Sequence, residues 1–160
     1  MTTEDPLRRQ LAAFIDFGEA HVTCEAALAE LDHSLQGKRA AGLPHSPWEL
    51  LEHMRITQHD ILEFCVSSKY EEMKWPDDYW PKSAAPPAAD SWKTSAASLR
   101  RDRDALRALA TNSGIDLSAK IPHGEGQTYL RELLLAQDHL SYHTGQLVLV
   151  RRALGAWPAE

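Results

Sequence analysis

The stretch SPWELLEHMRITQHDILEFC, residues 46–65, decides the fold prediction. It starts with a serine and a proline and has Glu49 at the third helical position, a combination typical of a capped helix start. Apolar side chains then follow at helical spacing, namely Leu50, Leu51, Met54, Ile61, Leu62 and Phe64. This pattern predicts a helix from Pro47 to about Cys65 that turns one face toward a core.

Three further helices are predicted, over about residues 6–35, 90–111 and 128–154. The first contains Gly18, where we expect a break or kink because glycine weakens helix interiors. Residues 22–35 carry apolar side chains at helical spacing, and Gly155 follows the end of the last helix. No stretch shows the alternation of a strand. We therefore expect an all-α fold, a four-helix bundle with long connecting loops, as a single domain over residues 1–160.

One of the expected connections, residues 67–90, is long and contains four prolines at positions 76, 81, 86 and 87. Irregular loops of this length are uncommon inside a compact domain and are often functional. This loop also carries three aromatic residues, Trp75, Tyr79 and Trp80. We expect these side chains to pack over the bundle as a lid.

Composition narrows the classes of protein to consider. The only cysteines are Cys24 and Cys65, which we expect to be reduced, buried thiols. The start of the chain, MTTEDP, does not resemble a signal peptide, and no apolar run approaches a membrane span, so we expect a cytoplasmic protein without membrane contact.

The net charge is −6, and the basic cluster Arg100, Arg101 and Arg103 alternates with aspartates. We interpret that cluster as a solvated helix face, which disfavours nucleic-acid binding.

Three of the eight histidines lie on helix faces that we expect to point inward. His139 and His143 are four residues apart, so they project from one face of the last predicted helix, about 6 Å apart at Cβ. His53 lies on the inward stripe of the 46–65 helix. Such a set can chelate one metal ion, and an open coordination position would give it a catalytic character. Hydrogen-bonded core histidines without metal are the other interpretation, and spacing alone does not decide between them.

Two segments resemble the DinB/YfiT-like superfamily of small four-helix-bundle metalloenzymes. They are SPWELLEH, residues 46–53, and DHLSYHTGQ, residues 138–146. Their order and separation, and the chain length, are similar to those of the family. The resemblance implies that His53, His139 and His143 are the ligands of one divalent metal ion, commonly nickel or zinc. A related thiol-dependent branch has a carboxylate in place of one ligand, whereas this chain has histidine at all three positions.

The resemblance also implies a reaction class. Characterised relatives use low-molecular-weight thiols such as mycothiol or bacillithiol as cosubstrates. We therefore expect a metal-dependent enzyme that transfers such a thiol to an electrophilic small-molecule substrate, or one that performs metal-assisted hydrolysis. A non-catalytic metal-binding or stress-response module is the alternative, so whether the chain is an enzyme stays open. The family resemblance leans toward a homodimer.

Three other polar residues are candidates for a role near the histidines. Asp60 follows His53 by almost two helical turns, so it is either a carboxylate supporting the site, a general base acting through water, or a partner of another buried group. Gln146 would hydrogen-bond a metal-bound water or another helix. His21 would approach the metal or serve as a surface or capping residue. We assign no chemistry to His33, His45, His59 or His123.

Overall fold

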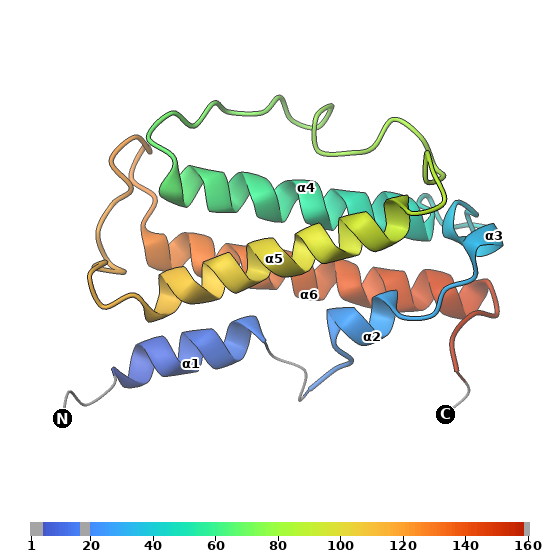
Figure 1. The fold of residues 1–160 in the computed structure, drawn as a ribbon, viewed down its shortest axis with the longest axis horizontal. Coiled ribbons are helices and arrows are strands. Elements are labelled where there is room, and N and C mark those ends of the chain that lie inside the picture. The colour runs from blue at the N-terminus through green and yellow to red at the C-terminus, as the bar shows by residue number, and fades with distance from the viewer. Residues whose placement is uncertain (1–4, 17–19, 159–160) are drawn as a thin grey trace.

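The four longest helices, α1 (Pro6–Ile15), α4 (Pro47–Val66), α5 (Ser91–Thr111) and α6 (Tyr129–Ala153), pack side by side along the long axis of the molecule (Figure 1). The computed structural model describes residues 5–16 and 20–158. Within these ranges there is no strand, and a single antiparallel bridge joins Lys120 to Thr128. The predicted all-α helical bundle is confirmed.

The start of α4 has the predicted capping box. The hydroxyl of Ser46 accepts a hydrogen bond from the Glu49 backbone N–H at 3.1 Å, and the Glu49 carboxylate accepts one from the Ser46 N–H at 2.7 Å. Pro47 occupies the first helical position, where its missing N–H costs nothing. The helix ends at Val66, one residue beyond the predicted end. Capping and apolar spacing therefore determine α4.

The prediction of one helix over residues 6–35 is wrong for its second part, and Gly18 lies outside the described residues. Two short helices, α2 (Cys24–Leu28) and α3 (His33–Gln36), replace the continuous helix expected for residues 22–35. Between them Ala29 has an extended backbone and Glu30 has a left-handed φ of 47°. The chain therefore turns away from the helical path directly after Leu28.

Tertiary hydrogen bonds explain why α2 stops so early. The buried Arg151 of α6 donates to the carbonyl oxygens of Ala27 and Ala29, at 2.7 Å each. The indole N–H of Trp92 on α5 donates to the Leu28 carbonyl at 3.3 Å. A longer α2 would use these carbonyl groups internally, whereas here side chains from two other helices satisfy them.

The apolar core consists of two clusters at opposite ends of α4 and α6, which run antiparallel (Figure 1). One cluster contains Leu51 and Met54 of α4 and Leu140 and Leu147 of α6, together with residues of α2. The other contains Ile61 and Leu62 of α4 and Leu133 and Ala136 of α6, together with residues of α1 and α5. His139 lies between Ala136 and Leu140, where one cluster gives way to the other, and His53 lies between Leu51 and Met54 of the first cluster.

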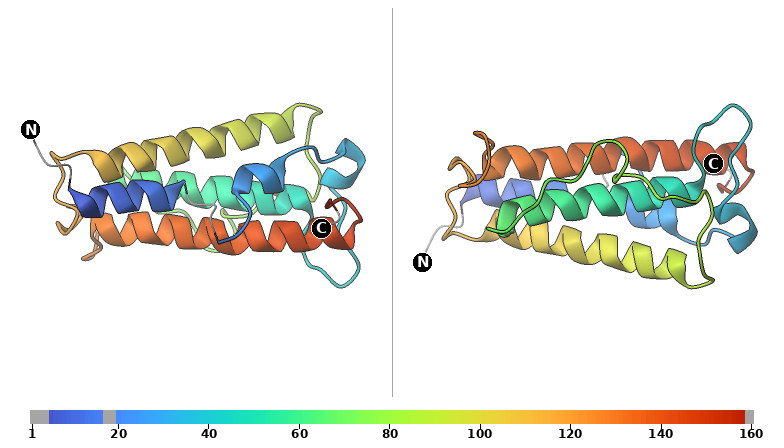
Figure 2. Two further views of the ribbon diagram at one scale, coloured as in Figure 1. Left: turned by 90° about the horizontal axis from the view of Figure 1, so that it is seen from below. Right: turned by 90° about the horizontal axis from the view of Figure 1, so that it is seen from above.

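The connection over residues 67–90 is an irregular loop, as predicted, and it crosses α4 on one side of the bundle (Figure 2). The Ser46 hydroxyl donates a hydrogen bond of 2.5 Å to the Ala84 carbonyl, which holds the loop to the start of α4. The two helices that follow this loop begin close to the predicted positions, α5 at Ser91 and α6 at Tyr129.

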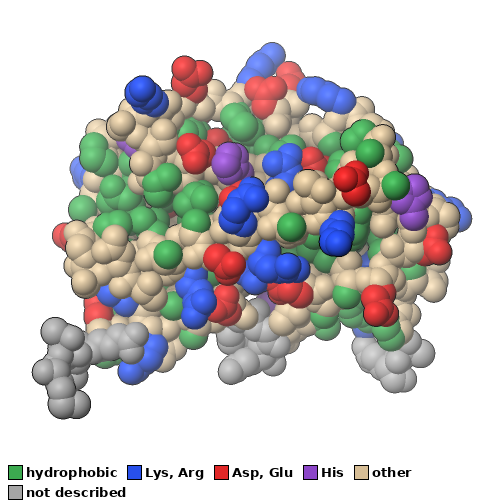
Figure 3. All heavy atoms as spheres, viewed as in Figure 1, with side chains coloured by type: hydrophobic (Ala, Val, Ile, Leu, Met, Phe, Trp, Pro, Cys, Tyr) green, Lys and Arg blue, Asp and Glu red, His purple; other side chains and the backbone are tan. Residues whose placement is uncertain are grey.

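Charged side chains of both signs are mixed on the face that carries α5 (Figure 3). The interpretation of the Arg100–Asp104 segment as a wholly solvated face is nevertheless wrong for two residues. Asp102 is buried and contacts the ring of His59 at 3.1 Å, while Arg103 forms an ion pair with Glu25. These partners come from α4 and α2, so they were not visible in the local charge pattern.

None of the described helices combines the length and the apolar character needed to cross a membrane.

Candidate metal centre

Three histidine side chains converge between α4 and α6. His53 comes from α4, and His139 and His143 come from α6; the nitrogens that each can offer to a metal lie within 4.8 Å of one another. The Nε2 atoms of His53 and His139 are 3.0 Å apart. His53 and His143 are buried, and His139 is half-buried. Spacing on two antiparallel helices has thus brought together the three residues named from the sequence.

Two of the rings are fixed by hydrogen bonds on the side facing away from the cluster. The Nδ1 of His53 donates to the backbone carbonyl of Tyr79 at 2.7 Å, because a carbonyl oxygen can only accept. The Nδ1 of His143 donates to the side-chain oxygen of Gln146, also at 2.7 Å. With the proton on Nδ1, the lone pair of each ring is on Nε2, the tautomer that such partners impose on metal-binding histidines.

Burial keeps the three rings uncharged at neutral pH. It lowers the pKa of His53 to about 4, although the bond to Tyr79 acts in the opposite sense. It lowers the pKa of His139 to about 3, and the neighbouring imidazoles add to the effect. The pKa of His143 is lowered by burial as well, against the bond to Gln146. Neutral imidazole is the form that binds metal, so no proton has to be displaced at pH 7.

These geometric features suit one divalent ion. Two nitrogens bound to one tetrahedral ion at about 2.0–2.1 Å lie about 3.3 Å apart, which is close to the 3.0 Å between the His53 and His139 Nε2 atoms. The hydroxyl of Thr57, one turn after His53 on α4, is buried without a hydrogen-bond partner among the described residues. An unpaired buried hydroxyl is costly unless a further group supplies its partner. Thr57 is four residues after His53 and so lies on the same face of α4, where a group bound beside the histidines could supply that partner.

Aromatic rings cover one side of the cluster. Trp80 stacks on His53 with ring centroids 3.9 Å apart and 2° between the planes. Its other neighbour is His45, stacked at 4.2 Å and 17°. Tyr79 and Trp80 thus take part in the predicted lid, whereas the Trp75 side chain is 67% exposed. The sequence analysis assigned no role to His45 and did not predict its contact with Trp80. The signal that could have indicated it is its position directly before Ser46, the cap of α4, at the end of that helix nearer to His53.

The other candidate residues have partners of their own. Both carboxylate oxygens of Asp60 accept hydrogen bonds from tyrosine hydroxyls, from Tyr70 at 3.0 Å and from Tyr79 at 2.7 Å. Tyr79 therefore contacts His53 through its backbone and Asp60 through its side chain. Gln146 accepts a hydrogen bond from His143 within its own helix. His21 is exposed, with its Nδ1 2.8 Å from the Val22 carbonyl oxygen, and it is not part of the cluster.

Two of the remaining histidines also have structural partners. His59 contacts Asp102, and the Nε2 of His123 is 2.8 Å from the carbonyl oxygen of Phe64. His33 lies on the short helix α3 and is exposed. These three residues lie outside the histidine cluster.

Comparison with known proteins gives one match. No curated protein and no solved structure shows significant similarity to the chain. A sequence model described as the DinB superfamily matches residues 17–147, which include α2 to α5, all three clustered histidines and most of α6. This range is most of the chain and agrees with the helical bundle and the buried histidines, and the protein therefore belongs to the DinB superfamily.

Proposed function

We propose that the protein is a metal-dependent enzyme that transfers a low-molecular-weight thiol to an electrophilic small molecule, with His53, His139 and His143 holding one divalent ion. The observation that carries this proposal is the convergence of three neutral imidazoles within 4.8 Å. Nickel and zinc are the ions we expect first, since both accept imidazole nitrogens. Metal-assisted hydrolysis is a close variant that would use the same site.

Three protein ligands are the number found in catalytic rather than structural zinc sites, because they leave a coordination position for substrate. A bound ion would lower the pKa of a thiol or a water molecule there and so supply a nucleophile at neutral pH. In the transfer, the sulfur attacks the electrophilic carbon, the leaving group departs with its bonding electrons, and the thiol proton passes to solvent.

The surrounding residues would position the ligands. The Tyr79 carbonyl and the Gln146 side chain orient His53 and His143. Asp60 would act through Tyr79, because its carboxylate holds the hydroxyl of the same residue whose carbonyl faces His53. Trp80 covers one face of the His53 ring and excludes water from it. These are positioning roles and not contacts with the reacting atoms.

Metal content tests the first half of the proposal. Tag-free protein is incubated with zinc or nickel, washed in a chelating buffer and analysed by mass spectrometry. We expect about one ion per chain in the wild type and none in His143→Ala. The matched control is His33→Ala, which removes an exposed histidine outside the cluster and should keep its ion. Absence of metal from the wild type would disprove the metal site.

Activity tests the second half. The metal-loaded protein is assayed for loss of free thiol with chlorodinitrobenzene as electrophile, using mycothiol, bacillithiol, glutathione and cysteine in parallel. We expect one thiol to be consumed at a rate that falls to background in His143→Ala. Turnover of an activated ester without thiol consumption would favour hydrolysis. A protein that binds metal and turns over neither substrate would be a non-catalytic metal-binding module.

A further inference from the structure

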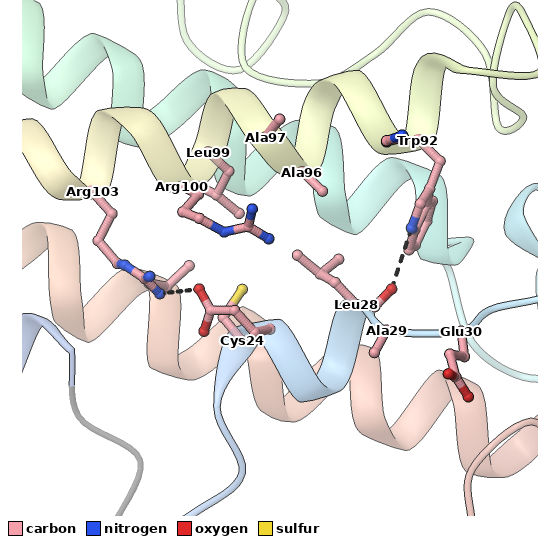
Figure 4. A pocket seen from close by; sticks show the side chains of 13 residues that line it. Cys24, Leu28, Ala29, Glu30, Trp92, Ala96, Ala97, Leu99, Arg100 and Arg103 are labelled. Carbon is pink, nitrogen blue, oxygen red and sulfur yellow. Dashed lines mark hydrogen bonds and ion pairs between the residues drawn. The ribbon is translucent and has the colours of Figure 1, made fainter.

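A second feature of the molecule is a cavity of about 520 Å³ between α2 and α5, with Leu140 of α6 in its lining (Figure 4). It lies on the side of the bundle where α2 packs, away from the loop of residues 67–90 (Figures 1 and 2). None of the three clustered histidines lines it. Its volume falls within the range of small-molecule binding pockets, about 300–1,000 Å³.

The sequence of α5 explains why the space is empty. Lys93, Ala96, Ala97 and Arg100 follow one another at intervals of three, one and three residues, so they share one face of the helix. The two alanines in the middle are too small to reach α2. On the opposite wall, α2 ends after five residues because its carbonyl groups are bound by Trp92 and Arg151. A hollow therefore remains between the two helices.

The inner lining of this cavity is apolar. Leu28, Leu99 and Leu140 are buried members of the core cluster, and the ring of Trp92 stands at one end (Figure 4). An aliphatic or aromatic body placed against these side chains would lose its contact with water, which is favourable in proportion to the area covered.

The rim carries an excess of positive charge. Three basic side chains, Lys93, Arg100 and Arg103, and two acidic ones, Glu25 and Glu30, line the cavity, although the whole chain has a net charge of −6. Arg103 is paired with Glu25. Lys93 and Arg100 form no ion pair with any residue that the structure describes, and the Arg100 guanidinium extends toward Leu28 across the space between the helices (Figure 4).

We propose that this cavity binds a small amphiphilic anion, an aliphatic carboxylate of medium chain length. The alkyl chain lies against Leu28, Leu99 and Leu140, and the carboxylate meets Arg100 and Lys93 at the rim. A guanidinium matches a carboxylate with two parallel hydrogen bonds, so Arg100 contributes direction as well as charge. An alkyl amine of the same length meets more positive than negative side chains at the rim, and a neutral alcohol cannot form an ion pair with the guanidinium.

Calorimetric titration with octanoate, octanol and octylamine tests the site in the full-length protein. We expect octanoate to bind at one site per chain, and the other two compounds to bind at least tenfold more weakly. Arg100→Gln should weaken octanoate binding by about tenfold, since it removes a hydrogen bond between charged groups. The matched control is Arg101→Gln, which removes the neighbouring guanidinium outside the cavity and should change the affinity less than twofold.

A second variant tests the location independently of charge. Ala96→Phe places a ring in the cavity and should abolish octanoate binding, while a circular dichroism melt shows whether the bundle still folds. Failure of octanoate to bind the wild type, equal losses in the two arginine variants, or equal binding of octanol would each overturn the proposal. Octanoate binding should be unchanged in His143→Ala, so the result is independent of the metal site.

Discussion

Neighbouring residues of α6 serve two very different sides of the bundle. His139 and His143 face α4, where they meet His53 and the aromatic loop. Leu140 and Leu147 belong to an apolar cluster that extends toward α2 and α5, and Leu140 reaches the cavity there. The polar atoms on the first side are held by directional partners, whereas the charges on the second side stay at a solvated rim around an apolar lining.

This difference shows how one helix can serve two kinds of recognition. A buried imidazole must have each nitrogen satisfied, so its position is fixed by hydrogen bonds such as those to Tyr79 and Gln146. An apolar cavity needs only shape, and an arginine or lysine at its edge keeps its hydration until a ligand arrives. We call the side of α6 that carries His139 and His143 the histidine side, and the side that carries Leu140 and Leu147 the leucine side. The histidine side should tolerate little change in its polar atoms. The leucine side should tolerate little change in the volume of its side chains.

The largest effect on stability is expected from the leucine side. Leu147→Ala removes a fully buried side chain and should cost about 3 kcal/mol of unfolding free energy, measured by urea denaturation of metal-free protein. Leu149→Ala is the matched control, because Leu149 is 54% exposed and its loss should cost less than about 0.5 kcal/mol. Loss of metal content from folded Leu147→Ala protein would show that the two sides are not independent.

Gln146→Ala should act on the histidine side alone. Removal of the partner of a metal-binding histidine typically weakens metal affinity about 10- to 100-fold, because the ring loses its fixed orientation. We expect this loss in a competition titration with a zinc indicator, with a thermal midpoint close to that of the wild type. Gln10→Ala, an exposed glutamine on α1, should leave the affinity unchanged. An unchanged affinity in Gln146→Ala would mean that the bond to His143 does not support the site.

Ser46→Ala tests the anchor of the loop on the histidine side. The substitution removes both the helix cap and the hydrogen bond to Ala84, and loss of a cap costs about 1 kcal/mol. Urea denaturation measures the change, with Ser68→Ala, an exposed loop serine, as the control. If the two variants are equally stable, the cap and anchor contribute nothing to the bundle.

The smallest response is expected from the cysteine in the lining of the cavity. Burial raises the pKa of the Cys24 thiol to about 12, so at pH 8 the reactive thiolate is nearly absent. Burial raises the pKa of Cys65 to about 12 as well. Ellman's reagent at pH 8 should therefore detect no fast-reacting thiol in native protein and two per chain in guanidinium chloride. Fast reaction of Cys24 in the native state would show that the reagent reaches this thiol through the cavity.

Much of the histidine side could be predicted from the sequence. The capping box marks the start of α4, and the apolar spacing fixes which of its faces is buried. The interval of four residues places His139 and His143 on one side of α6. These signals are local, and the structure confirms the helix that each predicts in α4 and α6. The family resemblance then named the same three histidines that the fold brings together.

The features that the sequence did not predict depend on contacts between residues that are distant in the chain. The end of α2 is set by Arg151 and Trp92, more than sixty positions away, and helical spacing in residues 22–35 gives no sign of them. The burial of Asp102 beside His59 and the ion pair of Arg103 with Glu25 depend on distant residues in the same manner. The stacking of His45 on Trp80 likewise joins a helix start to an irregular loop, which carries no periodic pattern to interpret.

The stack of His53, Trp80 and His45 makes the protein its own optical probe. An indole emits according to the charge and polarity of its immediate neighbours, and the ring of Trp80 lies 3.9 Å from a candidate metal ligand. A change of charge on His53 thus alters the surroundings of this fluorophore directly. Of the five tryptophans, it is the one in stacking contact with the histidine cluster, so a Trp80→Phe variant isolates its share of the emission. Occupancy of the site becomes measurable in solution without any added dye.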